Sequence, residues 1–319
     1  MVEYLKIGLI QPVIDPELCW NETPSNISTN FLLKNNDPNQ KIVPYRINID
    51  ELSAERVWNE IKQGLRLLLK GEIKPDIILI PELHLPNHRV GEIKKISKKH
   101  NVMIISGIDF NRNPLNKLKI RNRGIITIPN NWGNTGFSNR LSSLYFGKTY
   151  FTYMEKNMFQ NIEGEECLED QEQNMYIFNT KKFGSFGVMI CSDFFDIERM
   201  LLYQTRIQHL FIISLNKDLN TYFSMADALT RLLYCNVVIC NTGHYGGTYA
   251  VSPYDESNNR TILKYQGQRM FNLQTIQIPV ESLEIAQKFD FSKENKKTKG
   301  IKFKASPPGY YDKLQNISS

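Results

Sequence analysis

Residues 186–194 read Phe186-Gly187-Val188-Met189-Ile190-Cys191-Ser192-Asp193-Phe194, an apolar run that stops abruptly at a cysteine. The run predicts a short strand, buried on both faces, that ends where Cys191 begins a turn. In α/β proteins the loops after strand ends open onto a crevice and often carry reactive groups. The pattern alone also fits a structural cysteine, because a free thiol packs like a small apolar side chain. The rest of the chain must therefore decide between a nucleophile and a core residue.

Two further strand ends carry charged groups. Residues 77–80 form an apolar run typical of a strand covered on both faces, and Pro81-Glu82-Leu83 follows it. A carboxylate at the end of a buried strand is costly unless it is paired or functional, which makes Glu82 a candidate. A strand is also predicted over residues 149–154, and it leads into Lys156. Lys148 is a nearby competitor for the same role.

Strands and helices alternate along the chain, which predicts a layered α/β architecture. A helix is predicted from Ser53 up to Gly71, with Ser53 as its N-cap. Residues 13–50 are rich in Asn, Pro, Ser and Thr and are interpreted as a long loop or insertion. No internal repeat or linker divides the body, so residues 1–290 are predicted to form one domain.

Composition narrows the class of protein. The chain has 319 residues, of which 41% are hydrophobic and 23% charged, as in ordinary globular proteins. No apolar run approaches the roughly 18–20 residues of a membrane span, and the N-terminus lacks the features of a signal peptide. Five scattered cysteines argue against a disulfide framework or a structural zinc site. A soluble, cytoplasmic protein without membrane contact is expected.

The net charge of +6 is unevenly distributed. Residues 293–304 contain six lysines and one glutamate, so residues 291–319 are interpreted as a basic C-terminal tail. Such a tail can contact nucleic acid or an acidic partner. A solvated tail or surface strand is the favoured interpretation.

The three charged or reactive strand ends resemble the motifs of the nitrilase, or carbon–nitrogen hydrolase, superfamily. Pro81-Glu82-Leu83 is similar to the glutamate motif of that family, and residues 187–193 resemble its nucleophile strand and turn. Gly147-Lys148, followed eight residues later by Lys156, resembles its turn, strand and catalytic lysine. The likeness extends from residue 6 to about residue 287.

The resemblance implies a four-layer α-β-β-α sandwich that pairs with a second copy through its helical face, as a dimer or a larger homo-oligomer. It implies a catalytic set of Glu82, Lys156 and Cys191, with no metal and no cofactor. Cys191 would form a thioester, Lys156 would stabilise the tetrahedral intermediate, and Glu82 would move protons.

Two further groups are expected to assist. A second glutamate is common in this family, and the acidic loop offers Glu163, Glu165 and Glu166, of which Glu163 or Glu165 fits the expected distance beyond Lys156. The backbone N–H of Ser192 is the expected oxyanion donor, because it follows the nucleophile. His84 and His88 are four residues apart, but Pro86 between them argues against a shared helical face and a metal site.

The predicted function is an amidase-like hydrolase that cleaves a non-peptide carbon–nitrogen bond in a small-molecule amide or nitrile. No named subfamily supplies the substrate, because residues 215–218 carry charge where the family usually has a loop of small residues. The alternative is a catalytically silent, nitrilase-like sensor or interaction module that binds a metabolite and uses its basic tail to contact nucleic acid or protein. Thiol reactivity discriminates between the two, because only a nucleophile must react faster than the other cysteines.

Overall fold

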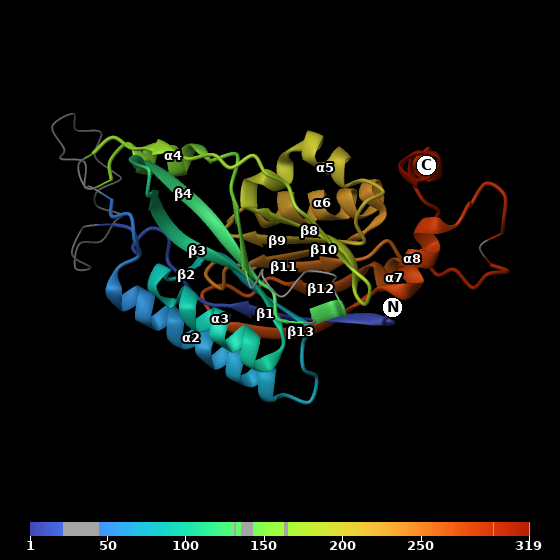
Figure 1. The fold of residues 1–319 in the computed structure, drawn as a ribbon, viewed down its shortest axis with the longest axis horizontal. Coiled ribbons are helices and arrows are strands. Elements are labelled where there is room, and N and C mark those ends of the chain that lie inside the picture. The colour runs from blue at the N-terminus through green and yellow to red at the C-terminus, as the bar shows by residue number, and fades with distance from the viewer. Residues whose placement is uncertain (22–44, 131, 135–142, 163–164, 296, 319) are drawn as a thin grey trace.

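The computed structural model describes residues 1–21, 45–130, 132–134, 143–162, 165–295 and 297–318. Two β-sheets lie face to face, and helices cover the outer side of each sheet (Figure 1). This arrangement confirms the predicted four-layer α-β-β-α sandwich. In the described part of the chain, no helix combines the length and the apolar composition that crossing a membrane requires.

Within the described residues, the first sheet has seven strands, six of them in the order β13-β1-β2-β3-β4-β5, and β6 pairs with β4. They are β1 (Tyr4–Gln11), β2 (Ile77–Leu85), β3 (Met103–Asn113), β4 (Asn116–Thr127), β5 (Ser143–Gly147), β6 (Leu168–Glu169) and β13 (Asn272–Pro279). The second sheet has the order β12-β11-β10-β9-β8-β7. Its strands are β7 (Ile177–Thr180), β8 (Gly184–Ile190), β9 (His209–Ser214), β10 (Asn236–Asn241), β11 (Thr248–Val251) and β12 (Thr261–Tyr265).

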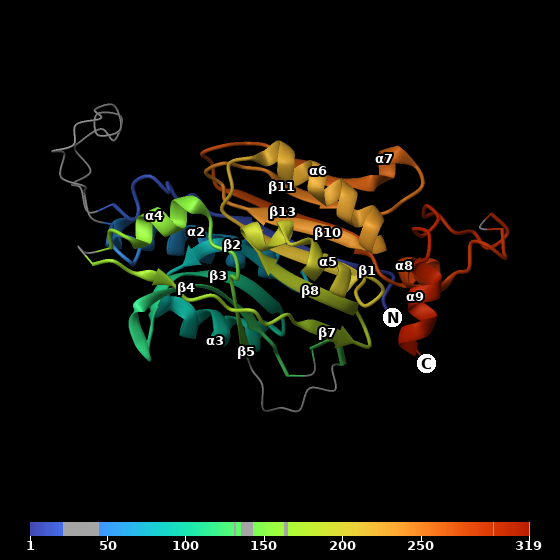
Figure 2. The same cartoon turned by 90° about the horizontal axis from the view of Figure 1, so that it is seen from above.

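Among the described residues, four helices form the outer layers. Helices α2 (Glu51–Lys70) and α3 (Val90–His100) cover the first sheet, and α5 (Ile197–Tyr203) and α6 (Leu219–Leu229) cover the second (Figures 1 and 2). The predicted N-cap of α2, Ser53, is wrong by three residues, because Asp50 is the N-cap and accepts a hydrogen bond from the Ser53 N–H. The shorter helices are α4 (Tyr153–Phe159), α7 (Ser257–Arg260), α8 (Glu281–Lys288) and α9 (Tyr310–Ser318). Single helical turns are η1 (Asn87–Arg89), η2 (Trp132–Asn134), η3 (Cys191–Phe195) and η4 (Thr230–Tyr234).

The alternation of side chains along β2 builds two hydrophobic cores. Ile77 and Leu79 face the second sheet and belong to the core between the sheets. Ile78 and Ile80 point the other way and belong to the core beneath α2. Successive side chains of a strand point to opposite faces, so a strand covered on both faces must be apolar at every position. This explains why residues 77–80 are continuously apolar, as the sequence indicated.

The predicted insertion at residues 13–50 is anchored at both of its described flanks. The indole of Trp20 donates to one Asp109 oxygen at 3.0 Å, and the Ile49 backbone donates to the other at 2.8 Å. Burial raises the pKa of Asp109 to about 6, although these donors favour its charged form. Residues 22–44 lie outside the described residues. The flanks of the insertion are therefore part of the core around β3.

Residues 291–319, predicted as a basic tail, pack in part against the body of the protein. Phe303 and Tyr310 are buried in a small core with Tyr234 and Leu283. The Phe303 ring stacks on Tyr254 with 4.7 Å between centroids. The N-terminus and α9 lie at the same end of the molecule (Figures 1 and 2).

Gly107 in β3 allows β2 to approach closely where Glu82 lies. A Cβ atom at Gly107 would lie 2.3 Å from the Glu82 Cα and 2.6 Å from the Leu83 backbone nitrogen. Gly107→Ala should therefore destabilise the fold by about 1–3 kcal/mol, since backbone must move to make room. Urea unfolding measures this effect. Gly91→Ala in α3 is the matched control, because nothing lies within 4 Å of its added Cβ. An equal loss of stability in both variants would contradict the close approach.

Candidate active site

Glu82, Lys148 and Cys191 meet in the interior between the two sheets. Glu82 lies in β2, Lys148 directly follows β5, and Cys191 directly follows β8. Lys148 Nζ lies 2.9 Å from Glu82 Oε1. The side chains of Lys148 and Glu82 are only 1% and 2% exposed, and Cys191 is 3% exposed. Such burial is tolerated for charged groups when each has a partner of opposite charge.

Lys148 is shared by two carboxylates. Its ammonium lies 2.8 Å from Glu155 Oε2 as well as 2.9 Å from Glu82 Oε1. Burial alone would lower the pKa of Lys148, but the Glu155 and Glu82 carboxylates together outweigh it and hold this pKa well above its usual value. The two carboxylates therefore favour the charged form of Lys148, and this charge acts on Cys191.

The prediction that Lys156 joins Glu82 and Cys191 is wrong in placement. Its side chain is 45% exposed, and its Nζ lies 2.9 Å from Glu169 Oε1. The reason is local: residues 153–159, part of the predicted strand and its continuation, form helix α4 instead. The strand is β5, which ends immediately before Lys148. Lys148, which the sequence left as a competitor for the same role, is the lysine that contacts Glu82.

A capping box explains why α4 begins where it does. The Thr152 hydroxyl accepts from the Glu155 N–H, and the Glu155 carboxylate accepts from the Thr152 N–H. The spacing Thr-x-x-Glu is the usual sequence signature of such a helix start. That signature was visible in the sequence and would have identified both the helix and Glu155.

Glu155 is the second carboxylate of the cluster, and the sequence prediction missed it. Its Oε1 accepts a hydrogen bond from Asn122 Nδ2 at 2.9 Å. The same Asn122 amide donates to Glu82 Oε1 at 2.7 Å, while Asn122 Oδ1 has no partner among the described residues. Asn122 and Lys148 therefore each bridge the two carboxylates.

The predicted assisting glutamates do not join this cluster where they can be located. Glu165 is 56% exposed and pairs with Arg112 at 3.2 Å. Glu163 lies outside the described residues. The second carboxylate that contacts Lys148 is therefore Glu155, and not Glu165 of the acidic loop.

Burial would raise the pKa of Glu155, but Lys148 and hydrogen bonds from Thr152 and Asn122 lower it below the ordinary value of 4.5. A carboxyl whose pKa falls on folding stabilises the fold above its unfolded pKa, and this contribution is lost as the pH falls. Glu155→Gln should therefore be less stable than the wild type at pH 7, and the difference should shrink below about pH 4.5. Urea unfolding from pH 3 to pH 8 tests this, and a difference that stays constant with pH would contradict it.

Both oxygens of Glu82 are held in place. Oε1 accepts from Lys148 and Asn122, and Oε2 accepts from the Leu215 backbone N–H at 2.9 Å. The backbone of Glu82 is also held in place, because His84 Nδ1 lies 2.6 Å from the Glu82 carbonyl oxygen. Leu83 has a φ of 62°, a strained conformation for a residue with a side chain. Such strain is found where the surrounding structure imposes it, often at functional sites.

His84 takes no part in a site with His88. His84 is fully buried, and its Nε2 lies 3.0 Å from Thr242 Oγ1. Burial lowers the pKa of His84 to about 4, so the ring is neutral. His88 lies at the surface, 4.0 Å from Glu55. His84 therefore supports the backbone of Glu82.

Cys191 stands on a sharp turn between β8 and η3. Its φ of 45° is left-handed, which is costly for a non-glycine residue and turns the chain abruptly after the strand. Burial, together with the Glu82 charge, raises the pKa of Cys191 to about 12, although Lys148 and Tyr222 act in the opposite direction. The resting thiol is therefore protonated at neutral pH, and a nucleophilic role requires a nearby proton acceptor.

The turn after Cys191 is tied to the segment that carries Lys148. Asp193 Oδ2 accepts from the Thr149 N–H at 2.9 Å, and Oδ1 accepts from the Tyr150 N–H at 2.8 Å. The Ser192 hydroxyl donates to the Tyr150 carbonyl at 2.5 Å. Arg199 in α5 contacts the Asp193 carboxylate and the Thr149 hydroxyl. These bonds fix the position of Lys148 relative to Cys191.

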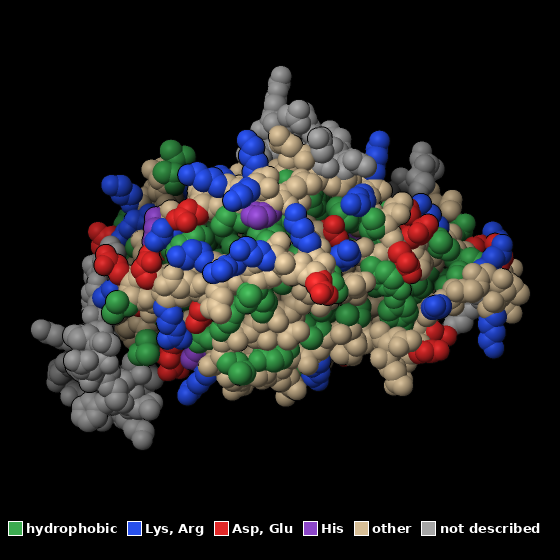
Figure 3. Space-filling model, turned by 90° about the horizontal axis from the view of Figure 1, so that it is seen from below, with side chains coloured by type: hydrophobic (Ala, Val, Ile, Leu, Met, Phe, Trp, Pro, Cys, Tyr) green, Lys and Arg blue, Asp and Glu red, His purple; other side chains and the backbone are tan. Residues whose placement is uncertain are grey.

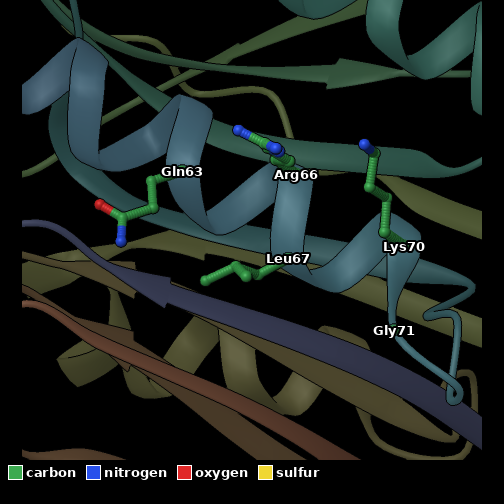
Figure 4. A pocket seen from close by; sticks show the side chains of 5 residues that line it. All are labelled: Gln63, Arg66, Leu67, Lys70 and Gly71. Carbon is green, nitrogen blue, oxygen red and sulfur yellow. The ribbon is translucent and has the colours of Figure 1, made fainter.

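Two surface depressions among the described residues lie away from this cluster. One of about 550 Å³ is lined by Gln63, Arg66, Leu67, Lys70 and Gly71 of the α2 end (Figure 4). It belongs to the face of α2 and α3, where Lys and Arg side chains gather (Figure 3). It contains no residue of the Glu82, Lys148 and Cys191 cluster, and we assign it no part in the chemistry.

The arrangement has the components of cysteine-based acyl transfer. It contains a thiol on a strained turn, a buried carboxylate to accept its proton, and a fixed ammonium for developing negative charge. The described residues give the Lys148 ammonium two acceptors, so one of its three N–H donors remains for a substrate oxygen.

No protein-family model and no curated protein sequence matches the chain. Several solved structures, in contrast, are similar to the chain. A CN-hydrolase superfamily protein from Xanthomonas campestris, with an arsenic adduct in its active site, is similar over 90% of this chain and 94% of its own, at 11% identity and a TM-score of 0.58. A branch 10 member of the nitrilase superfamily from Saccharomyces cerevisiae is similar over 89% of this chain and 93% of its own, at 14% identity and a TM-score of 0.57.

A mutant amidase from Nesterenkonia sp. AN1 is similar over 87% of this chain and 91% of its own, at 9% identity and a TM-score of 0.56. That structure carries the acetamide moiety of fluoroacetamide, added covalently at the active-site cysteine. The fold of our chain is therefore the nitrilase-superfamily fold, as the sequence motifs predicted.

Proposed function

We propose that this protein hydrolyses a non-peptide carbon–nitrogen bond in a small-molecule amide or nitrile, through a thioester on Cys191. The observation that carries the proposal is the ion cluster of the buried Glu82 and Lys148 with the partly buried Glu155, beside a thiol on a strained turn. Burying three charged groups is costly and gives stability little that an apolar core would not. A catalytic role accounts for their presence.

For an amide, the reaction has two stages. Glu82 accepts the Cys191 thiol proton as the sulfur bonds to the substrate carbonyl carbon. The negative charge on the substrate oxygen is stabilised by the Lys148 ammonium and by the Ser192 backbone N–H. Glu82 then returns its proton to the leaving nitrogen, the carbon–nitrogen bond breaks, and the amine departs. The thioester remains on Cys191.

In the second stage, Glu82 accepts a proton from water while the water oxygen attacks the thioester. The sulfur leaves as a thiolate and takes the proton back, and the product is a carboxylic acid. Glu155 accepts a second hydrogen bond from the Lys148 ammonium, beside the one to Glu82, and so keeps the ammonium in place through both stages.

The amidase from Nesterenkonia sp. AN1 supports amides as the first compounds to test. Release of ammonia or amine from a panel of aliphatic and aromatic amides and nitriles, compared between the wild type and Cys191→Ala, tests the proposal. We expect release only by the wild type, and equal release by both proteins would overturn it. The cytoplasmic location and the pairing with a second copy stay predictions.

A further inference from the structure

Tyr222 contacts the sulfur of Cys191. It lies in α6, is 2% exposed, and its hydroxyl donates a hydrogen bond to Cys191 Sγ at 3.2 Å. The Phe194 and Phe195 rings pack against it, with centroids 5.5 and 5.4 Å from that of Tyr222. The hydroxyl is therefore held at the sulfur by the packing of its ring.

The direction of this hydrogen bond determines what it can do. Burial raises the pKa of Tyr222 well above its usual value, and the neighbouring Cys191 raises it further, so the hydroxyl keeps its proton. It can donate to the sulfur but cannot act as a base. A donor binds an anionic acceptor about twice as strongly as a neutral one, so this contact favours the thiolate over the thiol.

We propose that Tyr222 is a further catalytic residue, whose hydroxyl stabilises the Cys191 sulfur whenever the sulfur carries negative charge. This inference rests on the proposed role of Cys191 as the nucleophile. During attack the thiol proton passes to Glu82, the sulfur electron pair forms the carbon–sulfur bond, and Tyr222 keeps its proton. During hydrolysis of the thioester the same hydroxyl receives the departing thiolate.

The contact is strongest when the sulfur is an anion and weakest when it is a thiol or thioester. An interaction of this kind lowers the barriers on both sides of the thioester, because it is stronger in the transition states than in the ground states. A tyrosine that only filled space beside Cys191 would have no such effect. The two possibilities predict different behaviour when the hydroxyl alone is removed.

Tyr222→Phe removes the hydroxyl and keeps the ring. The matched control is Tyr203→Phe, because Tyr203 is also buried, at 1% exposure. Its hydroxyl donates to the backbone carbonyls of Tyr176 and Val188 and not to the thiol. Thermal unfolding of both variants establishes that each is folded at the assay temperature.

The first measurement is the rate at which iodoacetamide alkylates Cys191 at pH 8, followed by peptide mass spectrometry. We expect alkylation about tenfold slower in Tyr222→Phe, which corresponds to a rise of one unit in the thiol pKa. Tyr203→Phe should react at the wild-type rate. A wild-type or faster rate in Tyr222→Phe would overturn the proposal.

The second measurement is the infrared S–H stretching band of Cys191, assigned as the band that disappears in Cys191→Ala. The band should shift in Tyr222→Phe and stay in place in Tyr203→Phe, because Tyr222 donates a hydrogen bond to the sulfur and Tyr203 donates to backbone carbonyls. Spectra that coincide for all three proteins would count against the hydrogen bond itself.

Neither measurement needs a substrate. If no amide acylates Cys191, the proposed function fails, while alkylation and the S–H band still decide the role of Tyr222. Once an amide substrate is found, the acylation rate in Tyr222→Phe should fall by the same factor as the alkylation rate. Acylation at the wild-type rate would show that Tyr222 takes no part in the reaction.

Discussion

Replacing Lys148 with methionine should reduce turnover by about 10²–10³-fold and destabilise the fold by about 3–5 kcal/mol. The change leaves the Glu82 and Glu155 carboxylates buried without the cation that they share. It also removes a donor for the charge that develops on the substrate oxygen, which is worth roughly 10²–10³ in rate. Urea unfolding measures the first effect, and the release of amine measures the second.

Lys156→Met is the matched control for this experiment, because it removes the same charge from a residue eight positions away. Lys156 pairs with Glu169 at the surface, where an ion pair contributes about 0.2–1 kcal/mol. The variant should therefore fold and turn over nearly as the wild type does. If Lys156→Met were the inactive variant and Lys148→Met the active one, the site would be assigned to the wrong lysine.

Glu82→Gln should reduce turnover by about 10²–10⁴-fold, because it removes the group that accepts and returns the proton. The amide has nearly the shape of the carboxylate, so the cavity changes little. One end of the amide is an NH₂ group, however, and it must face either the Leu215 N–H or the donors Lys148 and Asn122. Some loss of stability is therefore expected beside the loss of activity.

The choice of leaving group separates proton transfer from misplacement of the side chain. A nitroanilide leaves with less help from a proton donor than an alkylamine does. Glu82→Gln should therefore lose less activity on a nitroanilide than on the matching alkylamide. Glu165→Gln, at an exposed residue paired with Arg112, should behave as the wild type on both. An equal loss on both substrates would argue against proton donation by Glu82.

The sequence was sufficient to predict the layers of the fold, and it singled out Glu82 and Cys191, which the structure places in one buried cluster with Lys148. Residues 77–80 and 186–190 are apolar without interruption, and only a strand covered on both faces requires this. Cys191 directly follows the second run, whereas Glu82 lies two residues after the first and within β2, which continues to Leu85. The structural neighbours bear out the predicted sandwich.

The lysine was misassigned because a helix was taken for a strand. Residues 149–154 contain Thr, Tyr and Phe, which favour strands, but the Thr152 and Glu155 capping box sets the start of α4. Lys156 therefore lies on an exposed part of a helix. The residue that ends the real strand, β5, is Lys148.

Asn122 and Tyr222 could not be found from local patterns. Asn122 reaches Glu82 across 40 positions of the chain, and Tyr222 reaches Cys191 across 31. Neither position carries a motif of its own, and each is placed by the packing of a whole element against the site. Contacts of this kind depend on the tertiary structure and are not visible in the periodicity of one segment.

The most direct test of the account is the mass of the enzyme during turnover. The wild type is mixed with an amide that it hydrolyses, quenched in acid within the first turnovers, and measured by intact-mass spectrometry and peptide mapping. We predict an added acyl group, equal in mass to the amide less its amine, on the peptide that contains Cys191. Cys191→Ala should show no adduct and no turnover. Persistent turnover by Cys191→Ala, or an acyl group found only on another residue, would contradict the account.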